Sequence, residues 1–407
     1  DCPALTDTDR ENAPGERRPA GPDTHETADD AVIGVALRRS LLVMAVVAVA
    51  GLLLWWLSRP DSAPVAVAER ALEAPAPLPR PAAATLPALP FVDVTAAAGI
   101  DFVHDNGADG ERLLPETMGG GVAFTDLDGD RRPDLLFVDS GPWPWSERPP
   151  RPTAAVLYRN AGDGRFEDIT EGAGLGPGLY GQGVATGDFD ADGRPDLFIT
   201  AVGPNRLYRN LGGGRFEDVT AAAGVAGAPG AWSTSAAFLD YDRDGDLDLF
   251  VLNYVEWSRE LDFEVDYRLA GIGRAYGPPT NFPGTHAWLY RNDGGRYTDV
   301  SAEAGVQVAN PATGEPAGKG LALRVDDPDD DGWPDVIVAN DTVRNFFFRN
   351  REGRFEESGI ATGIAFDNSG GATGAMGIDA AHGGADGRYA VAIGNFANEM
   401  TSYFVAP

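Results

Sequence analysis

Residues 188–198 read DFDADGRPDLF and place Asp188, Asp190, Asp192 and Asp196 at alternate positions, with Arg194 between the last two. The same alternation returns three more times, and each copy precedes an apolar run of β-branched and aromatic residues. Carboxylates held within a few ångströms of one another repel strongly unless a cation lies between them. The repeated crowding of like charges therefore predicts metal sites.

The overall charge agrees with a chain that binds cations. The 407 residues include 62 acidic and 32 basic side chains, for a net charge of −30. Such a charge argues against nucleic acid as a partner, because phosphates would be repelled. The single cysteine, Cys2, excludes any disulfide within the chain, so another kind of cross-link has to stabilise an extracellular fold.

The four acidic loops share one numbering from their first Asp. Positions one, three, five and nine carry carboxylates, and position seven would add its backbone carbonyl, which suits the roughly six to eight oxygen ligands of Ca²⁺. A glycine at position six permits the sharp turn in three of the loops, as Gly193, Gly245 and Gly332. The predicted Ca²⁺-binding positions are Asp126, Asp128, Asp130, Arg132, Asp134; Asp188, Asp190, Asp192, Arg194, Asp196; Asp240, Asp242, Asp244, Asp246, Asp248; and Asp327, Asp329, Asp331, Trp333, Asp335.

Two features qualify these sites. The first loop has Gly129 at position four and Arg131 at position six, which predicts a strained or weaker site there. An EF-hand is excluded, because its position twelve requires a bidentate Glu and these loops place an apolar residue there. The alternative for any one loop is a solvated turn, which becomes improbable for copies in register. We therefore expect about four Ca²⁺ sites.

The N-terminal part predicts a membrane anchor. Residues 1–37 are polar and without periodicity, which indicates a disordered tail. Residues 38–58 contain an uncharged apolar run preceded by Arg38 and Arg39 and ending near Trp55 and Trp56, typical of a transmembrane signal anchor with a cytoplasmic N-terminus. A cleaved signal peptide, processed near residues 66–68, is the alternative. Residues 59–90 are rich in Pro and Ala and predict a semi-rigid linker.

Residues 91–407 repeat a unit of four strands. The motif LYRN occurs at 157–160, 207–210 and 289–292, and FFRN ends at Asn350; each is followed by a glycine-containing turn and RFED, RYTD or RFEE. Units built only of strands and repeated on this scale predict a β-propeller of four-stranded antiparallel blades, about five of them visible. FVDVT at 91–95 matches a fourth strand and would complete the last blade. A fifth copy keeps only Asp379 and Asp386, which predicts a blade without metal.

These motifs carry a family resemblance. The units look like the FG-GAP or VCBS-type repeats of integrin alpha-chain propellers. The strings FVHDNGADGERLLPETMGGGVAFTDLDGDRRPDL, LNYVEW and VANDTVRNFFFRN resemble the cartilage acidic protein family and its bacterial relatives. The resemblance implies a seven-bladed propeller, unclosed and C-terminally incomplete in this chain, with Ca²⁺ in the hairpin loops and a C-terminal ASPIC/UnbV-type domain that this sequence lacks. The insertion at 264–284 also lacks the cysteines that the family comparison leads us to expect.

A ligand face is predicted at the end of the blades opposite the metal loops, where the connections into the first strand and out of the second meet. Asn253 and Asn340 occupy equivalent positions there, and the alternative for each is an Asn that caps a turn. The predicted contact residues are Glu116, Gln182, Trp232, Asn253, Tyr254, Lys319, Asn340, Asp341 and Asn395.

The sequence thus predicts a membrane-anchored, extracytoplasmic Ca²⁺-binding propeller that serves as a binding or adhesion module for an unknown extracellular protein or glycan. One alternative is an extracellular hydrolase or lyase with its site in the channel, for which His104 and Glu116 could pair as a base and its orienting group. Another is a structural scaffold for a missing C-terminal domain. No Ser-His-Asp, Cys-His, zinc or phosphate-loop motif stands out, and no catalytic residue is assigned.

Overall fold

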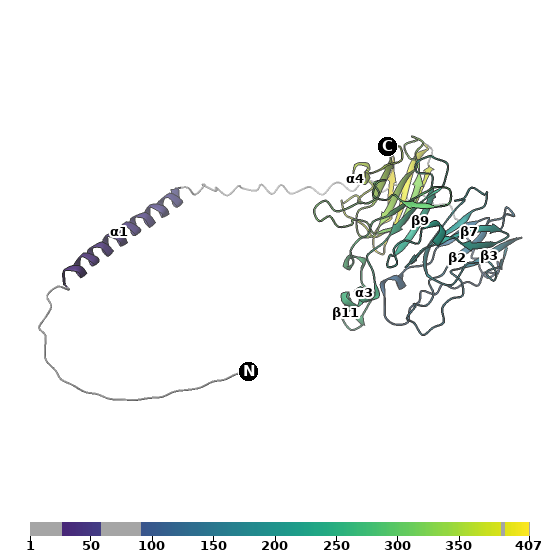
Figure 1. The fold of residues 1–407 in the computed structure, drawn as a ribbon, viewed down its shortest axis with the longest axis horizontal. Coiled ribbons are helices and arrows are strands. Elements are labelled where there is room, and N and C mark those ends of the chain that lie inside the picture. Colours follow the sequence, from purple (N-terminus) through teal and green to yellow (C-terminus); the bar gives the residue numbers. More distant parts are fainter. Residues whose placement is uncertain (1–26, 58–90, 384–386, 407) are drawn as a thin grey trace, which may run out of the picture. The chain divides into compact units, whose positions relative to one another are not determined.

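The computed structural model describes residues 27–57, 91–383 and 387–406, with side chains from residue 35 onward. The chain divides into an N-terminal unit and a C-terminal unit that begins at Pro90. The N-terminal unit contributes one helix, α1 (Thr27–Leu57), and the C-terminal unit is built almost entirely of strands (Figure 1).

Helix α1 carries an apolar stretch, Val35–Leu57, with a mean hydropathy of 2.4 and no part buried in the protein. Its length and composition are those of a membrane span or of a signal sequence. The helix begins at Thr27, earlier than the boundary predicted near residue 38, because elongation of a formed helix does not require apolar residues. Residues 1–26 of the predicted tail and the linker at 59–90 lie outside the described residues.

Five blades make up the C-terminal unit, as the repeats predicted. Four of them are four-stranded antiparallel sheets, and the fifth contains three described strands. The blades consist of β1 (Val122–Thr125), β2 (Asp134–Val138), β3 (Ala155–Gly162) and β4 (Arg165–Asp168); β5 (Tyr180–Gly187), β6 (Asp196–Val202), β7 (Arg206–Gly212) and β8 (Arg215–Asp218); β9 (Ser233–Leu239), β10 (Asp248–Asn253), β13 (Trp288–Asn292) and β14 (Tyr297–Asp299); β15 (Gly320–Asp326), β16 (Asp335–Asn340), β17 (Phe346–Asn350) and β18 (Phe355–Glu357); and β19 (Ala375–Gly383), β20 (Arg388–Asn395) and β21 (Ser402–Val405).

The first strands of the blades lie next to one another in the order β1, β5, β9, β15, β19 and form the inner wall of the propeller. Side-chain hydrogen bonds also join neighbouring blades directly. Thr200 Oγ1 in β6 donates to the carbonyl oxygen of Thr234 at 2.9 Å, and Thr234 Oγ1 donates to that of Gly320 at 2.7 Å. Neighbouring blades therefore share hydrogen bonds as well as apolar contacts.

The second strands of the second, third and fourth blades are buried on both faces, because each lies between the preceding and the following blade. All residues of β10 and β16 are buried, which explains why LDLFVLN and PDVIVAN are continuous apolar runs and not alternating ones. Each interblade core joins two neighbours. Leu136 and Leu157 of the first blade, for example, cluster with Leu197 and Tyr208 of the second.

One strand prediction is wrong. Residues 91–94 form no strand, and Phe91 is 90% exposed. A strand requires a neighbour with which to pair its backbone, and residues 91–94 have none among the described residues. Residues 95–99, which follow, form a turn. Through this turn the segment docks on the first blade, where Phe166 N donates to Ala98 O at 2.8 Å. A seven-bladed ring remains a prediction, since the described residues contain five blades.

An insertion between β10 and β13 caps one end of the inner strands. It contains α3 (Arg259–Val265), the short pair β11 (Arg268–Leu269) and β12 (Gly273–Arg274), and η2 (Pro279–Asn281), and it stands out beside the blades in Figure 1. Asp262 in α3 accepts a hydrogen bond from Leu114 N at 2.9 Å, at the start of η1 (Leu114–Thr117). The insertion therefore ties the third blade to the segment that precedes the first. Two further short helices, α2 (Thr220–Ala223) and α4 (Gly359–Thr362), follow the fourth strands of their blades.

The close approach of the inner strands yields a first prediction. A Cβ added to Gly183 in β5 would lie 2.3 Å from Thr234 O in β9. Gly183→Ala should therefore lower the free energy of unfolding by about 1–3 kcal/mol, measured by urea denaturation. Gly377→Ala is the matched control, because Gly377 also lies beside a register shift in an inner strand and its Cβ would meet nothing within 4 Å. An equal loss in both variants would contradict the proposed steric cause.

Candidate metal centres and the opposite face

The four acidic loops join the first and second strands of the first four blades. We number them loop 1 (residues 126–134), loop 2 (188–196), loop 3 (240–248) and loop 4 (327–335). Each loop leaves an inner strand and returns in the buried second strand, so its two ends are held by the sheet. The side chains between those ends make three kinds of contact.

The first Asp of each loop folds the loop around itself. In loop 2, Asp188 accepts hydrogen bonds from Asp192 N at 2.9 Å and Gly193 N at 2.8 Å. Loop 4 repeats this pattern at Asp327, with Asp331 N at 3.1 Å and Gly332 N at 2.8 Å. Backbone N–H groups thus gather around one carboxylate and bring the later positions of the loop back toward the first.

The ninth Asp is the buried anchor of each loop. Asp196 is fully buried; its Oδ2 accepts from Phe189 N at 3.0 Å and its Oδ1 from Asn210 N at 2.7 Å. Burial raises the pKa of Asp196 and Asp248 to about 7 and that of Asp335 to about 6; nearby carboxylates add to the rise and the N–H donors oppose it. Without a bound cation, the anchor therefore keeps its proton to a higher pH than an exposed Asp does.

In each loop, three carboxylates can bring one oxygen each within 4.8 Å of the others. The groups are Asp126, Asp128 and Asp134; Asp188, Asp190 and Asp196; Asp240, Asp242 and Asp248; and Asp327, Asp329 and Asp331. Among the described residues, Asp190 Oδ1, Asp240 Oδ1, Asp242 Oδ1 and Asp335 Oδ2 are buried without a hydrogen-bond donor. Buried acceptors without donors are costly, and a cation would satisfy them. The residues present therefore fit a cation that prefers oxygen ligands.

The clustered carboxylates include only some of the predicted ligand positions, and metal binding by these residues stays a prediction. Positions one and three belong to the group in every loop, but position nine belongs to it in loops 1 to 3 and position five in loop 4 alone. Position five instead closes the turn: Asp192 Oδ1 accepts from Arg194 N at 3.0 Å, and its Oδ2 pairs with the guanidinium group of Arg194. Asp130 and Arg132 make the same contacts in loop 1. The backbone-carbonyl role of position seven stays a prediction.

Arginines already neutralise part of this charge. Arg209 Nε lies 2.7 Å from Asp190 Oδ2, and Arg349 pairs with Asp329. Both arginines belong to the RN motif of the third strand, which places them beside position three of their own loop. A divalent cation would have to share these oxygens with the guanidinium groups.

Loop 1 exchanges the residue types at two left-handed positions. Arg131 at position six has φ of 69° where loops 2 to 4 have glycine, and Gly129 takes position four, where those loops have a left-handed residue with a side chain, Ala191, Arg243 or Asp330. Each loop thus holds one such residue, and the weaker first site stays a prediction. In the fifth blade, Asp379 lies in β19 and its Oδ1 is 3.3 Å from Arg324 Nη1, while Asp386 lies outside the described residues.

At the opposite end, most of the predicted ligand residues meet, but beneath the insertion. Tyr254 donates a hydrogen bond of 2.5 Å to Asp341 Oδ2, and Trp232 Nε1 donates to Gln182 Oε1 at 3.1 Å. The rings of Trp232 and Tyr254 make an edge contact with 4.9 Å between their centroids. All four of these side chains are almost fully buried.

The charged members of this group contact the insertion itself. Glu116 accepts hydrogen bonds from Trp143 Nε1 at 3.2 Å and from Tyr276 OH at 3.1 Å, and burial raises its pKa. Lys319 Nζ donates to Pro279 O at 2.6 Å, and burial lowers its pKa although Asp341 opposes the shift. The insertion thus supplies partners for the charges at this end of the propeller.

The three asparagines of the predicted ligand face have partners within the protein. Asn253 Nδ2 donates to His286 O at 2.9 Å, Asn340 Nδ2 donates to Arg344 O at 3.0 Å, and Asn395 Nδ2 donates to Met400 O at 2.6 Å. Asn340 and Asn395 bond to a backbone carbonyl four and five residues ahead, as the turn-capping alternative expects, whereas Asn253 bonds across the insertion. Their role as ligand contacts stays a prediction.

The considered pairing of His104 with Glu116 is wrong. His104 Nδ1 lies 3.3 Å from Asp139 Oδ1, while Glu116 is held by Trp143 and Tyr276. The segment that carries His104 packs beside the end of β2, where Asp139 also accepts from Asp105 N at 2.8 Å. These contacts place His104 next to Asp139, and among the described residues neither ring nitrogen of His104 has a hydrogen-bond partner.

The loops correspond to a known repeat. Residues 126–199 and 188–251 match the FG-GAP-like repeat family, and each match begins at the first Asp of a loop. This chain is an FG-GAP repeat protein. Each matched FG-GAP unit runs from one metal loop to the second strand of the following blade, so the sequence repeat spans a blade interface.

Individual proteins with similarity to this FG-GAP chain cover it in part. Human cartilage acidic protein 1 is 28% identical over 189 residues, which make up 45% of this chain and 24% of that protein. The chain therefore spans about a quarter of the relative's length. A solved structure of an Agrocybe aegerita lectin, described as recognising non-reducing terminal N-acetylglucosamine, has a TM-score of 0.39 at 16% identity over 68% of this chain and 61% of that chain.

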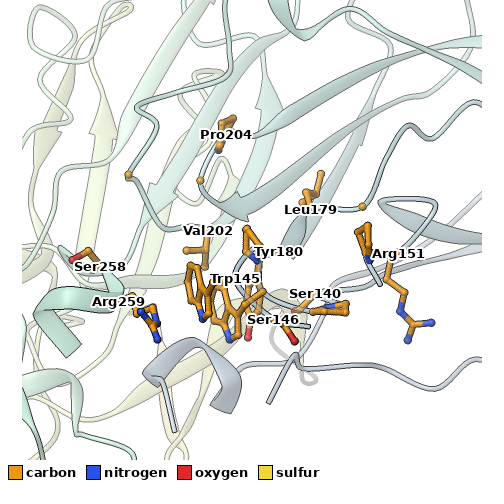
Figure 2. A pocket seen from close by; sticks show the side chains of 18 of the residues that line it. Ser140, Trp145, Ser146, Arg151, Leu179, Tyr180, Val202, Pro204, Ser258 and Arg259 are labelled. Atoms are coloured by element: carbon orange, nitrogen blue, oxygen red, sulfur yellow. The ribbon is translucent and has the colours of Figure 1, made fainter. Parts of the chain in front are cut away.

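Sequence reasoning missed an aromatic pocket on this FG-GAP propeller. The rings of Trp143 and Tyr180 stack with 3.7 Å between their centroids, and Trp145 stacks on Trp143 at 4.9 Å. They line a cavity of about 650 Å³ in which Trp145 and Tyr180 lie between Arg259 and Arg151 (Figure 2). The stretch GPWPWSERPPRP at 141–152 was the available signal, because the corresponding connection in the second blade is only VGPN.

The raised pKa values of the FG-GAP loops predict a pH dependence for the protein without metal. A carboxyl group whose pKa is about 7 when folded and about 3.9 when unfolded binds more protons in the folded state between these values. In EDTA, these groups should therefore make stability fall from pH 5 to pH 7.5.

Thermal melts in EDTA and in excess Ca²⁺ test this expectation. Because bound Ca²⁺ requires the carboxylate form, the gain in melting temperature from Ca²⁺ should grow over the same pH range. A Ca²⁺-dependent gain that is equal at pH 5 and pH 7.5 would contradict the assignment of these carboxyl groups to the metal.

Proposed function

We propose that this chain is a membrane-anchored, extracytoplasmic Ca²⁺-binding propeller that acts as a binding or adhesion module. The observation that carries the metal assignment is a loop with three clustered carboxylates that recurs in four blades, together with buried carboxylate oxygens in loops 2 to 4 that lack donors among the described residues. Ca²⁺ suits these loops because it accepts irregular oxygen shells at roughly 2.3–2.6 Å, whereas Mg²⁺ demands near-ideal octahedral geometry.

The proposed anchor is helix α1. Arg38 and Arg39 precede its most apolar part and Trp55 and Trp56 lie at its end, a pattern that favours a cytoplasmic N-terminus and a propeller outside the membrane. In an oxidising compartment, Ca²⁺ would stabilise blades for which the single cysteine cannot supply a disulfide.

Ca²⁺ removal tests the metal assignment. Asp188→Asn should reduce the difference in melting temperature between Ca²⁺ and EDTA, because one loop then loses the carboxylate around which it folds. A site at a hundred times its dissociation constant contributes about 2.7 kcal/mol. Glu356→Gln is the control, because Glu356 is exposed in β18 and outside every loop. Melts of the wild type that are identical in Ca²⁺ and EDTA would exclude a stabilising metal.

The contact surface is proposed at the capped end, where the aromatic pocket opens. Trp145 is 41% exposed, while Trp143, Tyr180 and Trp257 beneath it are buried, so one ring is presented on a rigid aromatic base. Aromatic side chains that are fixed in this way bind ligands at little cost in conformational entropy. The predicted ligand residues Trp232 and Tyr254 support this base from below, since Trp232 makes an edge contact with Trp257.

Arrays of extracellular glycans and proteins test the binding role. Trp145→Ala should weaken binding of any ligand retained by the wild type by about tenfold, because the exposed anchor of the pocket is lost. Tyr403→Ala is the control, since Tyr403 is 68% exposed on the fifth blade and outside the pocket. Equal binding by both variants would place the contact surface elsewhere, and no retained ligand would contradict the binding role.

A further inference from the structure

In three of the four blades with an RN motif, the asparagine that ends the motif donates a hydrogen bond to the metal loop of the preceding blade. Asn210 Nδ2 of the second blade donates to Leu127 O of loop 1 at 3.0 Å, and Asn292 Nδ2 of the third donates to Phe189 O of loop 2 at 2.8 Å. Asn350 Nδ2 of the fourth blade donates to Tyr241 O of loop 3 at 2.8 Å. All three asparagines are buried. The same contact thus recurs at three successive interfaces.

The accepting residue is position two of the loop, between the ligand positions one and three. Its N–H donates to the ninth Asp of its own loop, at 2.9 Å for Leu127, 3.0 Å for Phe189 and 3.0 Å for Tyr241. Its side chain is buried against the first aromatic residue of the next blade's fourth strand, as in Phe189 with Tyr297 and Tyr241 with Phe355. The orientation of position two is therefore set partly by the following blade.

Each asparagine also holds its own loop. Asn292 N donates to Asp248 Oδ1 at 2.8 Å, and its Nδ2 donates to Leu247 O at 3.1 Å. One buried amide group thus connects two metal loops, its own and the preceding one. Buried hydrogen bonds of this kind orient metal ligands without touching the metal.

Asn160 and loop 4 each lack the interblade hydrogen bond, although Asn160 ends an RN motif and loop 4 is an acidic loop. Asn160 Nδ2 donates to Pro133 O of its own loop at 2.9 Å, and Asn160 is only half-buried. In loop 4, position two is Pro328, which has no N–H, and Asp335 Oδ2 is left without a donor among the described residues. In the fifth blade, Ala406 follows the third strand and stands at the position that the RN asparagine has in the other blades.

We propose that Asn210, Asn292 and Asn350 are positioning residues for the metal loop of the preceding blade, so that loops 1 to 3 reach full affinity for Ca²⁺ only with the next blade docked. Loop 4 binds independently of the blade that follows it. This inference rests on the proposed Ca²⁺ function of the loops.

Hydrogen exchange followed by mass spectrometry across a Ca²⁺ titration tests the proposal on the full chain. The amides of Asp192 and Gly193, which donate to Asp188, report on loop 2. Asn292→Ala should raise the Ca²⁺ concentration at half-protection of loop 2 by about tenfold, although Asn292 belongs to another blade. Loop 4 should keep its midpoint, which a general loss of stability would not allow.

Asn160→Ala is the matched control, because it removes an own-loop contact of the same kind and leaves the loop 2 midpoint unchanged. Asn210→Ala, read at the amides of Asp130 and Arg131 in loop 1, repeats the test at another interface if Asn292→Ala does not fold. A loop 2 midpoint within twofold of the wild type in Asn292→Ala would overturn the proposal. If no wild-type loop gains protection with Ca²⁺, the metal function itself fails, and the inference fails with it.

Discussion

The buried aspartate at position nine of each loop is the interaction on which the blades depend. In loops 1 to 3 it accepts one backbone N–H from the loop and another from the third strand, so it fastens the loop to the sheet at a point from which water is excluded. A carboxylate in such a place is costly unless donors or a cation surround it. In loops 1 to 3 this carboxylate is thus both the structural anchor of the loop and one of the three carboxylates that can hold a metal ion.

The repeat extends this anchor from one blade to the next. The FG-GAP units begin at a metal loop and end in the second strand of the following blade. The RN asparagine that bonds to this loop lies in the third strand of the following blade, just beyond the end of the unit. A blade without the acidic loop, such as the fifth, also lacks the asparagine, which is consistent with the two acting together.

The two ends of the propeller are stabilised by different physics. At the loop end, charge and backbone donors dominate, and a cation would complete them. At the other end, an apolar cluster that includes Leu113, Trp143, Trp232 and Tyr254 lies under the insertion, and its few charges are paired or bonded to backbone. The ligand contact is accordingly proposed at the end that the insertion caps, where apolar packing and not a metal ion holds the side chains in place.

The sequence by itself determined the repeat, the all-β blades, the acidic loops and the apolar helix, because these follow from local patterns of charge and hydrophobicity. Only the tertiary structure decided which residues meet across blades: Asn350 and Tyr241 are 109 residues apart, and Arg259 and Glu111 are 148 apart. The exposed state of residues 91–94 and the burial of Trp232 were likewise decided by which neighbours pack on them. Alternation along the chain specifies a strand and its loop, whereas the partner of a buried donor depends on how neighbouring blades pack against each other.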